Sequence, residues 1–335
     1  MQDVPADSRI VYVSCTQAGY EVLRRLLDEG VPIAEVVTIT PDAGARHGVS
    51  GYHDFSAVAA ERDLPLYYPE TYAMDTEADR DHFATLDGDL LIVNGWQRLV
   101  PGEIIETFDA GAVGNHGSAF GLPKGRGRSP LNWSLVEDLD RFLISLITLA
   151  VEADAGTVVA TRKFDVTEFD DIETLYYKIV MTVQEMLLES IGPLLRGEAE
   201  LREQPGAPTF YPKRNPADGA VNWGDTTRDV YNLVRAVTRP YPGAFTEYDG
   251  ERIMLWEARP FSDDLALDAA EGEVVQTFET TGEFVVAAAD GTLLVTDWTA
   301  DDWVPERGMR LTSLGENDRV DGFDQRHNLV SAEGR

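Results

Sequence analysis

The sequence predicts an α/β protein in which a doubly wound, mostly parallel sheet is followed by a small, mainly β domain. Residues 9–39 carry strand, helix and strand patterns in succession, and such a β-α-β start predicts a parallel sheet. From residue 245 onward, short strand patterns follow one another with tight-turn sequences between them. A chain of 335 residues with 43% hydrophobic content can bury two such cores. The proline- and glycine-containing stretch 198–208 is the predicted linker, which gives domains at 1–204 and 205–335.

The first domain alternates strand and helix patterns that are separated by breaker residues. Apolar runs rich in β-branched residues predict strands, and apolar residues three or four apart predict helices. Residues 40–53 contain Pro41 and three glycines and are predicted to form a long loop. We expect strands at 9–13, 34–39, 64–68, 89–93, 112–114, 142–149 and 157–163, and helices at 20–27, 55–62, 79–86, 101–107, 130–136 and 172–195.

The second domain is predicted to contain one helix and a small β-barrel or half-open sheet. Asp249-Gly250 and Asp290-Gly291 are typical of tight turns between antiparallel strands. Residues from about 315 onward are polar, and we expect them to form a frayed end. The helix is expected at 230–237 and the strands at 245–248, 252–258, 272–278, 283–289 and 293–296.

The formal net charge is -31 and the sequence pI is about 4.3. Lysine occurs at four positions, so 24 of the 28 cationic residues are arginine. Because the hydrophobic content is normal, disorder does not explain the acidity. The charge therefore predicts a halophilic protein that works in molar salt, where screening lengths of about 3 Å remove most self-repulsion. The alternative is an ordinary acidic protein. Either interpretation argues against a nucleic-acid partner, which requires a basic face.

Composition also sets expectations about location and cofactors. No segment approaches the roughly 20 apolar residues of a membrane-spanning helix, and the first residues do not resemble a signal peptide. The single cysteine, Cys15, cannot form an internal disulfide, so we expect a cytoplasmic protein without a membrane partner. The turn at 14–19 is not Gly-x-Gly-x-x-Gly, so NAD is not supported. No cysteine and histidine cluster has metal-ligand spacing, and we expect no metal.

The segment 111–133 is the candidate functional region. It is predicted to contain the end of a strand, a glycine-rich loop and a helix start at Ser129-Pro130, with Ser129 as the N-cap. His116 is the histidine that lies within a motif, and a catalytic imidazole needs an orienting carboxylate. Asp154, in a turn after a buried strand, is the best candidate for this orienting carboxylate. The alternatives are an incidental surface histidine and an aspartate that serves only turn chemistry.

Ser118 allows a second, weaker interpretation. On an extended segment it lies on the same face as His116, two residues earlier, so the pair could form a serine hydrolase nucleophile and base. The Gly-x-Ser-x-Gly motif is missing from the sequence, which weakens this hypothesis.

Several segments together resemble the 10-formyltetrahydrofolate-dependent formyltransferases, the family of methionyl-tRNA formyltransferase and the sugar-nucleotide N-formyltransferases. That family has Asn-x-His-x-Ser-Leu-Leu-Pro-x-x-Arg-Gly and then an Asp-x-Gly turn some 35 residues later. The matching segments are His116-Gly117-Ser118, Leu122–Gly127, Asp154-Ala155-Gly156, Trp96–Pro101, Asn215–Gly219, Val221–Trp223, Arg235-Ala236 and Pro240–Phe245.

This resemblance implies a formyltransferase-like Rossmann domain, an OB-like C-terminal domain and 10-formyltetrahydrofolate as co-substrate, with no metal. It also implies that a primary amine attacks the formyl carbon, that His116 moves a proton, that Asp154 orients His116, and that an asparagine amide binds the developing oxyanion. The implied catalytic residues are His116, Asp154 and Asn115. The implied folate-binding residues are Asn94, Gly95, Trp96, Leu99, Ser118, Gly121, Leu122, Pro123 and Asp154, and the implied acceptor-binding residues are Lys124, Arg126, Arg128 and Tyr241.

The sequence departs from the family pattern at two points. The family asparagine lies two residues before the histidine, where this chain has Gly114, and Asn115 follows. Because a shift of one residue on a strand reverses the face, either the backbone bulges to restore Asn115 or another group binds the oxyanion. The segment Ser118–Pro123 is also two residues longer than the family pattern, which changes the expected folate pocket.

The acceptor is expected to be a small-molecule amine, and an amino-sugar nucleotide is the favoured class. Residues 261–335 contain 17 Asp and Glu, 5 Arg and no Lys, about -12 in total, so a surface that docks transfer RNA is not expected there. Alternatives are methionyl-tRNA, another amine such as a glycinamide ribotide or an amino acid, a formyltetrahydrofolate hydrolase, and a non-catalytic folate-binding protein. A homodimer is the oligomer that we consider.

The charge predicts how stability depends on salt. Raising potassium chloride from about 0.1 M to molar concentration should raise the melting temperature, because screening relieves repulsion among the acidic side chains. Thermal unfolding followed by circular dichroism measures this, with sucrose as a non-ionic control for solute exclusion. A melting temperature that stays flat or falls with salt would contradict the halophile interpretation.

Overall fold

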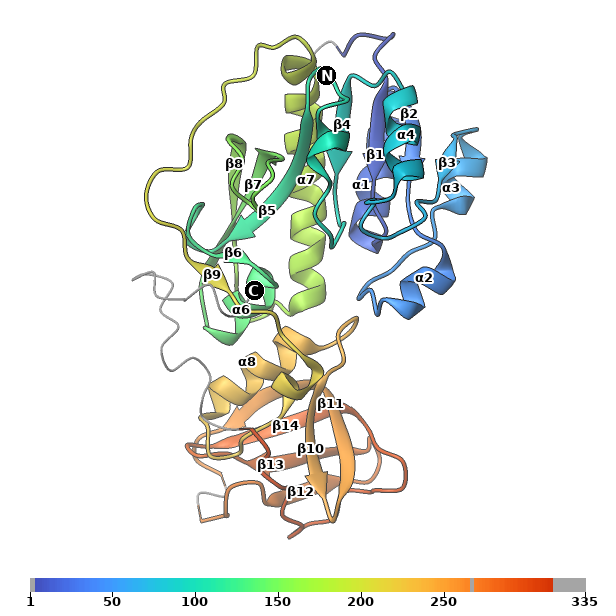
Figure 1. Ribbon diagram of the computed structural model, residues 1–335. Coiled ribbons are helices and arrows are strands. Elements are labelled where there is room, and N and C mark those ends of the chain that lie inside the picture. The colour runs from blue at the N-terminus through green and yellow to red at the C-terminus, as the bar shows by residue number, and fades with distance from the viewer. Residues whose placement is uncertain (1–3, 266–267, 316–335) are drawn as a thin grey trace. The chain divides into compact units, whose positions relative to one another are not determined.

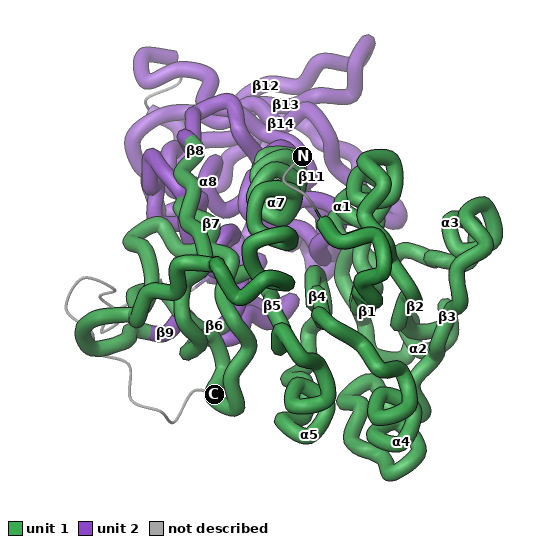
Figure 2. Tube along the Cα trace, turned by 90° about the horizontal axis from the view of Figure 1, so that it is seen from above, with its two compact units in different colours: residues 1–127, 143–164, 176–209 green, residues 128–142, 165–175, 210–335 purple. Residues whose placement is uncertain are grey.

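The computed structural model describes residues 4–265 and 268–315, so the end predicted to fray lies outside the described residues. The described residues form two compact units (Figure 2). Unit 1 takes those within 1–127, 143–164 and 176–209, and unit 2 takes those within 128–142, 165–175 and 210–335. The units are therefore interleaved along the chain, and the boundary between residues 204 and 205 stays a prediction.

Unit 1 is built on a seven-stranded sheet with the order β3-β2-β1-β4-β5-β7-β8 (Figure 1). Neighbouring strands from β3 to β5 are parallel, and β7 runs antiparallel to β5. The predicted doubly wound, mostly parallel sheet is confirmed. Its strands are β1 (Ile10–Val13), β2 (Ile33–Val37), β3 (Leu66–Tyr67), β4 (Leu90–Val93), β5 (Ala112–Ser118), β7 (Arg141–Thr148) and β8 (Val158–Asp165).

Alternate side chains of each central strand enter two separate cores. In β1, Ile10 and Tyr12 pack in the core that includes α1 and α7, whereas Val11 and Val13 pack in the core that includes α4 and α5. Burial on both faces is why β1 and β4 are unbroken apolar runs. The helices of this unit are α1 (Gln17–Asp28), α2 (Pro41–Arg46), α3 (Ser56–Glu61), α4 (Glu77–Thr85), α5 (Gly102–Ile105) and most of α7 (Ile172–Leu195), and the short strand β6 covers Arg126–Gly127.

The prediction of a continuous loop at 40–53 is wrong, because α2 lies within it. Thr40 caps this helix by accepting a hydrogen bond from the Ala43 N–H, and Pro41 occupies the first turn, where its missing N–H costs nothing. Gly44 lies inside this helix and packs against Tyr52. A Cβ at this position would come within 2.6 Å of the Tyr52 ring. The glycine therefore marks a close contact rather than a turn.

The strand that leads into the glycine-rich segment is longer than predicted. β5 continues through Ser118, so His116 lies on a strand and not in a loop. Helix α6 (Pro130–Val136) begins at Pro130 as expected, but Ser129 has a left-handed backbone (φ 54°) and its side chain makes no capping hydrogen bond. Ser129 therefore occupies the predicted N-cap position, but its side chain does not cap the helix.

Unit 2 contains a five-stranded antiparallel sheet with the order β10-β11-β14-β13-β12. The segment 308–312 bonds both edges of this sheet, because Thr312 N donates to Glu247 O and Val274 N donates to Met309 O, each at 2.8 Å. The two edges are thereby covered, which gives the sheet a barrel-like closure. The predicted small, mainly β domain is confirmed. Its strands are β10 (Ala244–Tyr248), β11 (Glu251–Ser262), β12 (Val274–Phe278), β13 (Glu283–Ala287) and β14 (Thr292–Thr299), preceded by β9 (Phe210–Tyr211) and α8 (Thr227–Val237).

Candidate active site

The order of the parallel strands places several candidate site segments at one edge of unit 1. The strand order reverses between β1 and β4, and ligands of open α/β sheets bind beyond the carboxyl ends at such a switch point. Residues 14–16 follow β1, residues 94–96 follow β4, and the second half of β5 extends beyond its pairing with β4. The sheet itself therefore fixes the start of each of these segments.

His116 projects from β5, where its neighbours are fixed by pairing with β7. The register runs without a shift from Val113 opposite Thr148 to Ser118 opposite Leu143. Because side chains alternate along a strand, His116 shares a face with Gly114 and Ser118, and Asn115 lies on the opposite face. This pairing shows no bulge that would bring Asn115 to the face of His116.

Asp154 lies in a tight turn between β7 and β8. Its φ of 56° is left-handed, which is uncommon for a residue other than glycine and is tolerated well by aspartate. Two residues on, a Cβ at Gly156 would come within 1.7 Å of the Thr148 carbonyl oxygen, so the turn requires glycine there. The turn is closed by a hydrogen bond from Ala155 N to Glu152 O at 3.3 Å.

The structure brings His116 and Asp154 together. The imidazole Nδ1 lies 3.2 Å from Asp154 Oδ1, and both side chains are largely buried, at 11% and 23% exposed. The other ring nitrogen, Nε2, lies 3.1 Å from the Gly125 carbonyl oxygen. The second carboxylate oxygen, Oδ2, accepts the Gly127 N–H at 3.1 Å. Nδ1 therefore faces a carboxylate oxygen and Nε2 faces a backbone carbonyl oxygen.

The glycine-rich loop after β5 is held by its own hydrogen bonds. Ser118 is buried, and its hydroxyl accepts the Phe120 N–H at 3.1 Å. The Lys124 N–H donates to Gly121 O, and the Thr209 N–H donates to Pro123 O. Ser118 therefore shapes the start of this loop, and this geometry gives no support to its use as a nucleophile.

The segment after β4 provides buried polar and aromatic groups. Asn94 is buried, and its amide donates to the Tyr12 hydroxyl at 3.1 Å. Gly95 has φ of 75°, and a Cβ there would come within 2.1 Å of Thr16 Oγ1. The indole nitrogen of Trp96 is buried and has no hydrogen-bond partner among the described residues. Leu99 is 61% exposed.

The four residues predicted to bind the acceptor differ in their surroundings. The Arg126 side chain is 8% exposed and donates two hydrogen bonds to the side-chain oxygen of Gln204, so it serves the fold of this region. Lys124 lies in the glycine-rich loop of unit 1, whereas Arg128 and Tyr241 belong to unit 2. A role for any of the four in acceptor binding stays a prediction.

The sequence reasoning missed two residues that shape the site. Thr209 accepts the Gly125 N–H through its hydroxyl at 2.8 Å and the Arg126 N–H through its carbonyl at 2.9 Å. The Gln204 side chain accepts a hydrogen bond from Arg126 and donates one to the backbone of the turn that contains Asp154. Both residues lie in the stretch predicted as a linker or directly after it, and no motif marks them.

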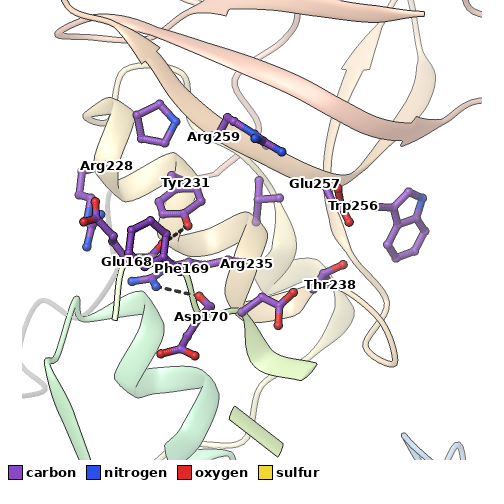
Figure 3. Close-up of a pocket in the computed structure, with 14 residues that line it drawn as sticks. Glu168, Phe169, Asp170, Arg228, Tyr231, Arg235, Thr238, Trp256, Glu257 and Arg259 are labelled. Atoms are coloured by element: carbon purple, nitrogen blue, oxygen red, sulfur yellow. Dashed lines mark hydrogen bonds between the residues drawn. The ribbon is translucent and has the colours of Figure 1, made fainter. Parts of the chain in front are cut away.

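Unit 2 contains a cavity of about 450 Å³ between α8, residues 256–260 of β11 and residues 168–171 (Figure 3). Two of its lining arginines are engaged by the unit itself. Arg235 is buried and donates to the carbonyl oxygens of Thr167 and Asp170, each at 2.8 Å. Arg228 donates to Asp138. These arginines therefore stabilise unit 2, and we assign no ligand to this cavity.

Among residues 4–265 and 268–315, no group of three or more histidine, cysteine, aspartate or glutamate side chains is arranged to hold a metal ion. Within the same ranges, no helix combines the length and the apolar character that crossing a membrane requires.

The fold is that of an α/β protein whose mostly parallel sheet carries a largely buried histidine–aspartate pair on and beside β5. Two family models cover most of the sequence. The model described as formyl transferase matches residues 9–191, and the model described as formyl transferase, C-terminal domain, matches residues 213–302. The chain belongs to the formyl transferase family. The resemblance that the sequence motifs indicated is thereby confirmed.

Solved structures share the fold at low identity. HypX from Aquifex aeolicus, in complex with tetrahydrofolic acid, matches at TM-score 0.62 and 21% identity over 88% of this chain and 44% of its own. An N-formyltransferase from Helicobacter canadensis, in complex with folinic acid and dTDP-3-aminofucose, matches at 0.62 and 13% over 87% and 100%. Methionyl-tRNA formyltransferase from Clostridium thermocellum matches at 0.55 and 15% over 88% and 100%. The chain thus spans less than half of the HypX chain.

Cys15, directly after β1, should be unreactive in the folded protein. Its side chain is fully buried beside the Tyr72 hydroxyl at 3.3 Å, and burial raises the pKa of the thiol to about 11. At pH 8 only roughly one thiol in a thousand would be the reactive thiolate. Modification by Ellman's reagent should therefore be at least about a hundredfold slower in the native protein than in the urea-unfolded chain. Comparable rates in the two states would contradict this burial.

Proposed function

We propose that this protein transfers a formyl group from 10-formyltetrahydrofolate to a primary amine. The observation that carries the proposal is the contact between His116 and Asp154, at 3.2 Å, in a chain that matches the family models over both halves. A positioned imidazole with an orienting carboxylate is suited to moving a proton during attack by an amine.

The segment after β4 offers groups that fit a folate co-substrate. The buried indole N–H of Trp96 lacks a partner among the described residues, and the heterocycle of a folate carries acceptors for such a donor. Leu99 and Val151 are apolar yet 61% and 82% exposed, and Val151 lies 3.5 Å from where a Cβ of Gly102 would be. Exposed apolar side chains at a sheet edge favour a flat ring system. We therefore propose that these residues, together with Asn94 and Gly95, contact the folate.

The chemistry assigned to this chain is proton transfer at His116. The folate supplies the formyl carbon as the electrophile. In the transfer, the amine nitrogen bonds to the formyl carbon, the bond from that carbon to the folate nitrogen breaks, and that nitrogen gains a proton. His116 Nε2 takes a proton from the amine, and Asp154 stabilises the resulting imidazolium through Nδ1. Because Gly125 O lies 3.1 Å from Nε2, it is placed to accept a second amine N–H while the first is removed.

The group that binds the developing negative charge on the formyl oxygen differs from the family pattern. Asn115 lies on the face opposite His116, because the pairing of β5 with β7 is regular. An asparagine at position 114, where the family has it, would bring its Cβ to 2.9 Å from Leu149 Cδ2 and 3.2 Å from Val93 O. A side chain at position 114 would therefore require the end of the Leu149 side chain to move. We infer that a donor other than Asn115 serves the oxyanion in this protein.

An amino-sugar nucleotide is the acceptor that we propose. The related N-formyltransferase from Helicobacter canadensis was crystallised with dTDP-3-aminofucose, and its whole length matches 87% of this chain. The charge of about -12 over residues 261–335 is unfavourable for docking of transfer RNA. Methionyl-tRNA is therefore the weaker candidate, although a methionyl-tRNA formyltransferase shares the fold.

Binding and transfer assays test the donor and the acceptor separately. Calorimetry in molar potassium chloride should show binding of 10-formyltetrahydrofolate and none of NAD. Incubation with a panel of amines should then give tetrahydrofolate and a formylated amino-sugar nucleotide in equal amounts. Release of formate without an acceptor would instead identify a hydrolase, and folate binding with no turnover would identify a binding protein. Either result would overturn the proposal.

Variants of β5 and the turn after β7 test the mechanism. Loss of a positioned acid–base group costs roughly 10²–10⁴-fold in rate, so His116→Ala and Asp154→Asn should each lower kcat at least about a hundredfold. The double variant should lose little more than the worse single variant, because the pair acts as a unit. Asn115→Ala is the matched control on the opposite face and should stay within about threefold of the parent enzyme. A loss at Asn115 as large as that at His116 would refute the alternation argument, and full turnover in His116→Ala would refute the mechanism.

A further inference from the structure

Gln204 turns inward from an exposed stretch of chain. Within residues 201–207, all of which are described, Gln204 is half-buried and its neighbours are exposed. Just before it, Arg202 and Val158 exchange two backbone hydrogen bonds, at 2.7 and 2.9 Å, which fix the chain beside β8. The Gln204 amide then donates to the carbonyl oxygens of Asp154 at 2.8 Å and Gly156 at 2.7 Å. The side chain thus closes the turn that presents the Asp154 carboxylate.

The same side chain binds the loop on the other side of the imidazole. Gln204 Oε1 accepts hydrogen bonds from Arg126 Nε at 3.2 Å and Nη2 at 2.8 Å. Arg126 Nη1 also lies 3.7 Å from the Glu152 carboxylate. The planar guanidinium offers its donors in a fixed geometry, and a lysine could not reproduce this fork. We call the paired side chains of Arg126 and Gln204 the brace.

The brace controls both acceptors that flank His116. Arg126 lies between Gly125, whose carbonyl faces Nε2, and Gly127, whose N–H binds the Asp154 carboxylate. Gln204 holds the backbone of Asp154 itself. Its two hydrogen bonds hold the left-handed turn at Asp154 in place. Without the brace, the turn and the loop would lose the hydrogen bonds that join them through these two side chains.

We propose that Gln204 is a positioning residue, which holds the Asp154 turn and the Gly125 carbonyl at the two nitrogens of His116 and thereby fixes the tautomer and orientation of the ring. Its effect on rate rests on the proposed formyl transfer. Its effect on the ring does not, because the ring contacts exist in the protein alone. Gln204 itself contacts none of the proposed reacting groups, so its role is indirect.

The first test is spectroscopic and does not require activity. The protein is labelled with ¹⁵N-histidine, and the ring signals of His116 are identified by their loss in His116→Gln. In Gln204→Met, a variant of similar length without the amide, these signals should move towards those of Asp154→Asn. Gln184→Met is the matched control, because the Gln184 amide donates to Glu21 O at 2.9 Å on the exposed surface of α7. Parent-like His116 signals in folded Gln204→Met would overturn the proposal.

The second test uses kinetics and a second variant. Gln204→Met should lower kcat by about tenfold or more, with KM for the folate within about twofold, and should add little to Asp154→Asn, because both act on one unit. Gln204→Glu keeps a partner for Arg126 but turns an acceptor towards two carbonyl oxygens, so it should behave like Gln204→Met. If Gln204→Met does not fold, the ring signals of Gln204→Glu decide in the same way. Shifted ring signals in a chain without transferase activity would refute the proposed function and support the positioning role.

Discussion

The carboxylate of Asp154 is the point at which three separate stretches of unit 1 meet. One oxygen faces the imidazole on β5, the other accepts the Gly127 N–H of the glycine-rich loop, and the backbone of the same residue is bonded by Gln204. This arrangement requires a turn so tight that Gly156 packs directly on the Thr148 carbonyl. The position of the acid is therefore set by backbone geometry and only then refined by side chains.

The parallel sheet supplies the rigidity that such a site needs. His116 lies on a strand paired with β7, and the cores on both faces of β1 and β4 fix the level at which each following segment begins. Catalytic groups on regular elements are held more closely than groups on loops, because the backbone hydrogen bonds of the strand resist displacement. The glycine-rich loop is the exception, and there Thr209 and the brace take over the role that strand pairing plays elsewhere.

Much of this architecture could be predicted because it depends on local pattern. The buried strands are apolar runs, the tight turns carry Asp-Gly pairs, and the resemblance to the formyltransferase motifs singles out His116 and Asp154. The missed features depend on contacts between distant segments. Gly44 has the sequence context of a loop although it packs against Tyr52 inside a helix, and Gln204 has no motif at all. No local rule distinguishes a glutamine in a linker that is solvated from one that closes a turn 50 residues away in sequence.

The replacement of an asparagine by Gly114 is the departure with the largest consequence for the chemistry. Gly114 lies on the same face of β5 as His116 and carries no side chain. A Cβ at this position would lie 2.9 Å from Leu149 Cδ2 and 3.2 Å from Val93 O. Asn115 cannot compensate without a register shift, which would also move His116 away from Asp154 and Gly125. The regular strand pairing that positions His116 therefore keeps the Asn115 side chain on the opposite face of β5. We propose that stabilisation of the formyl oxygen in this protein comes from a donor outside positions 114 and 115, such as a backbone N–H or a group on the acceptor itself.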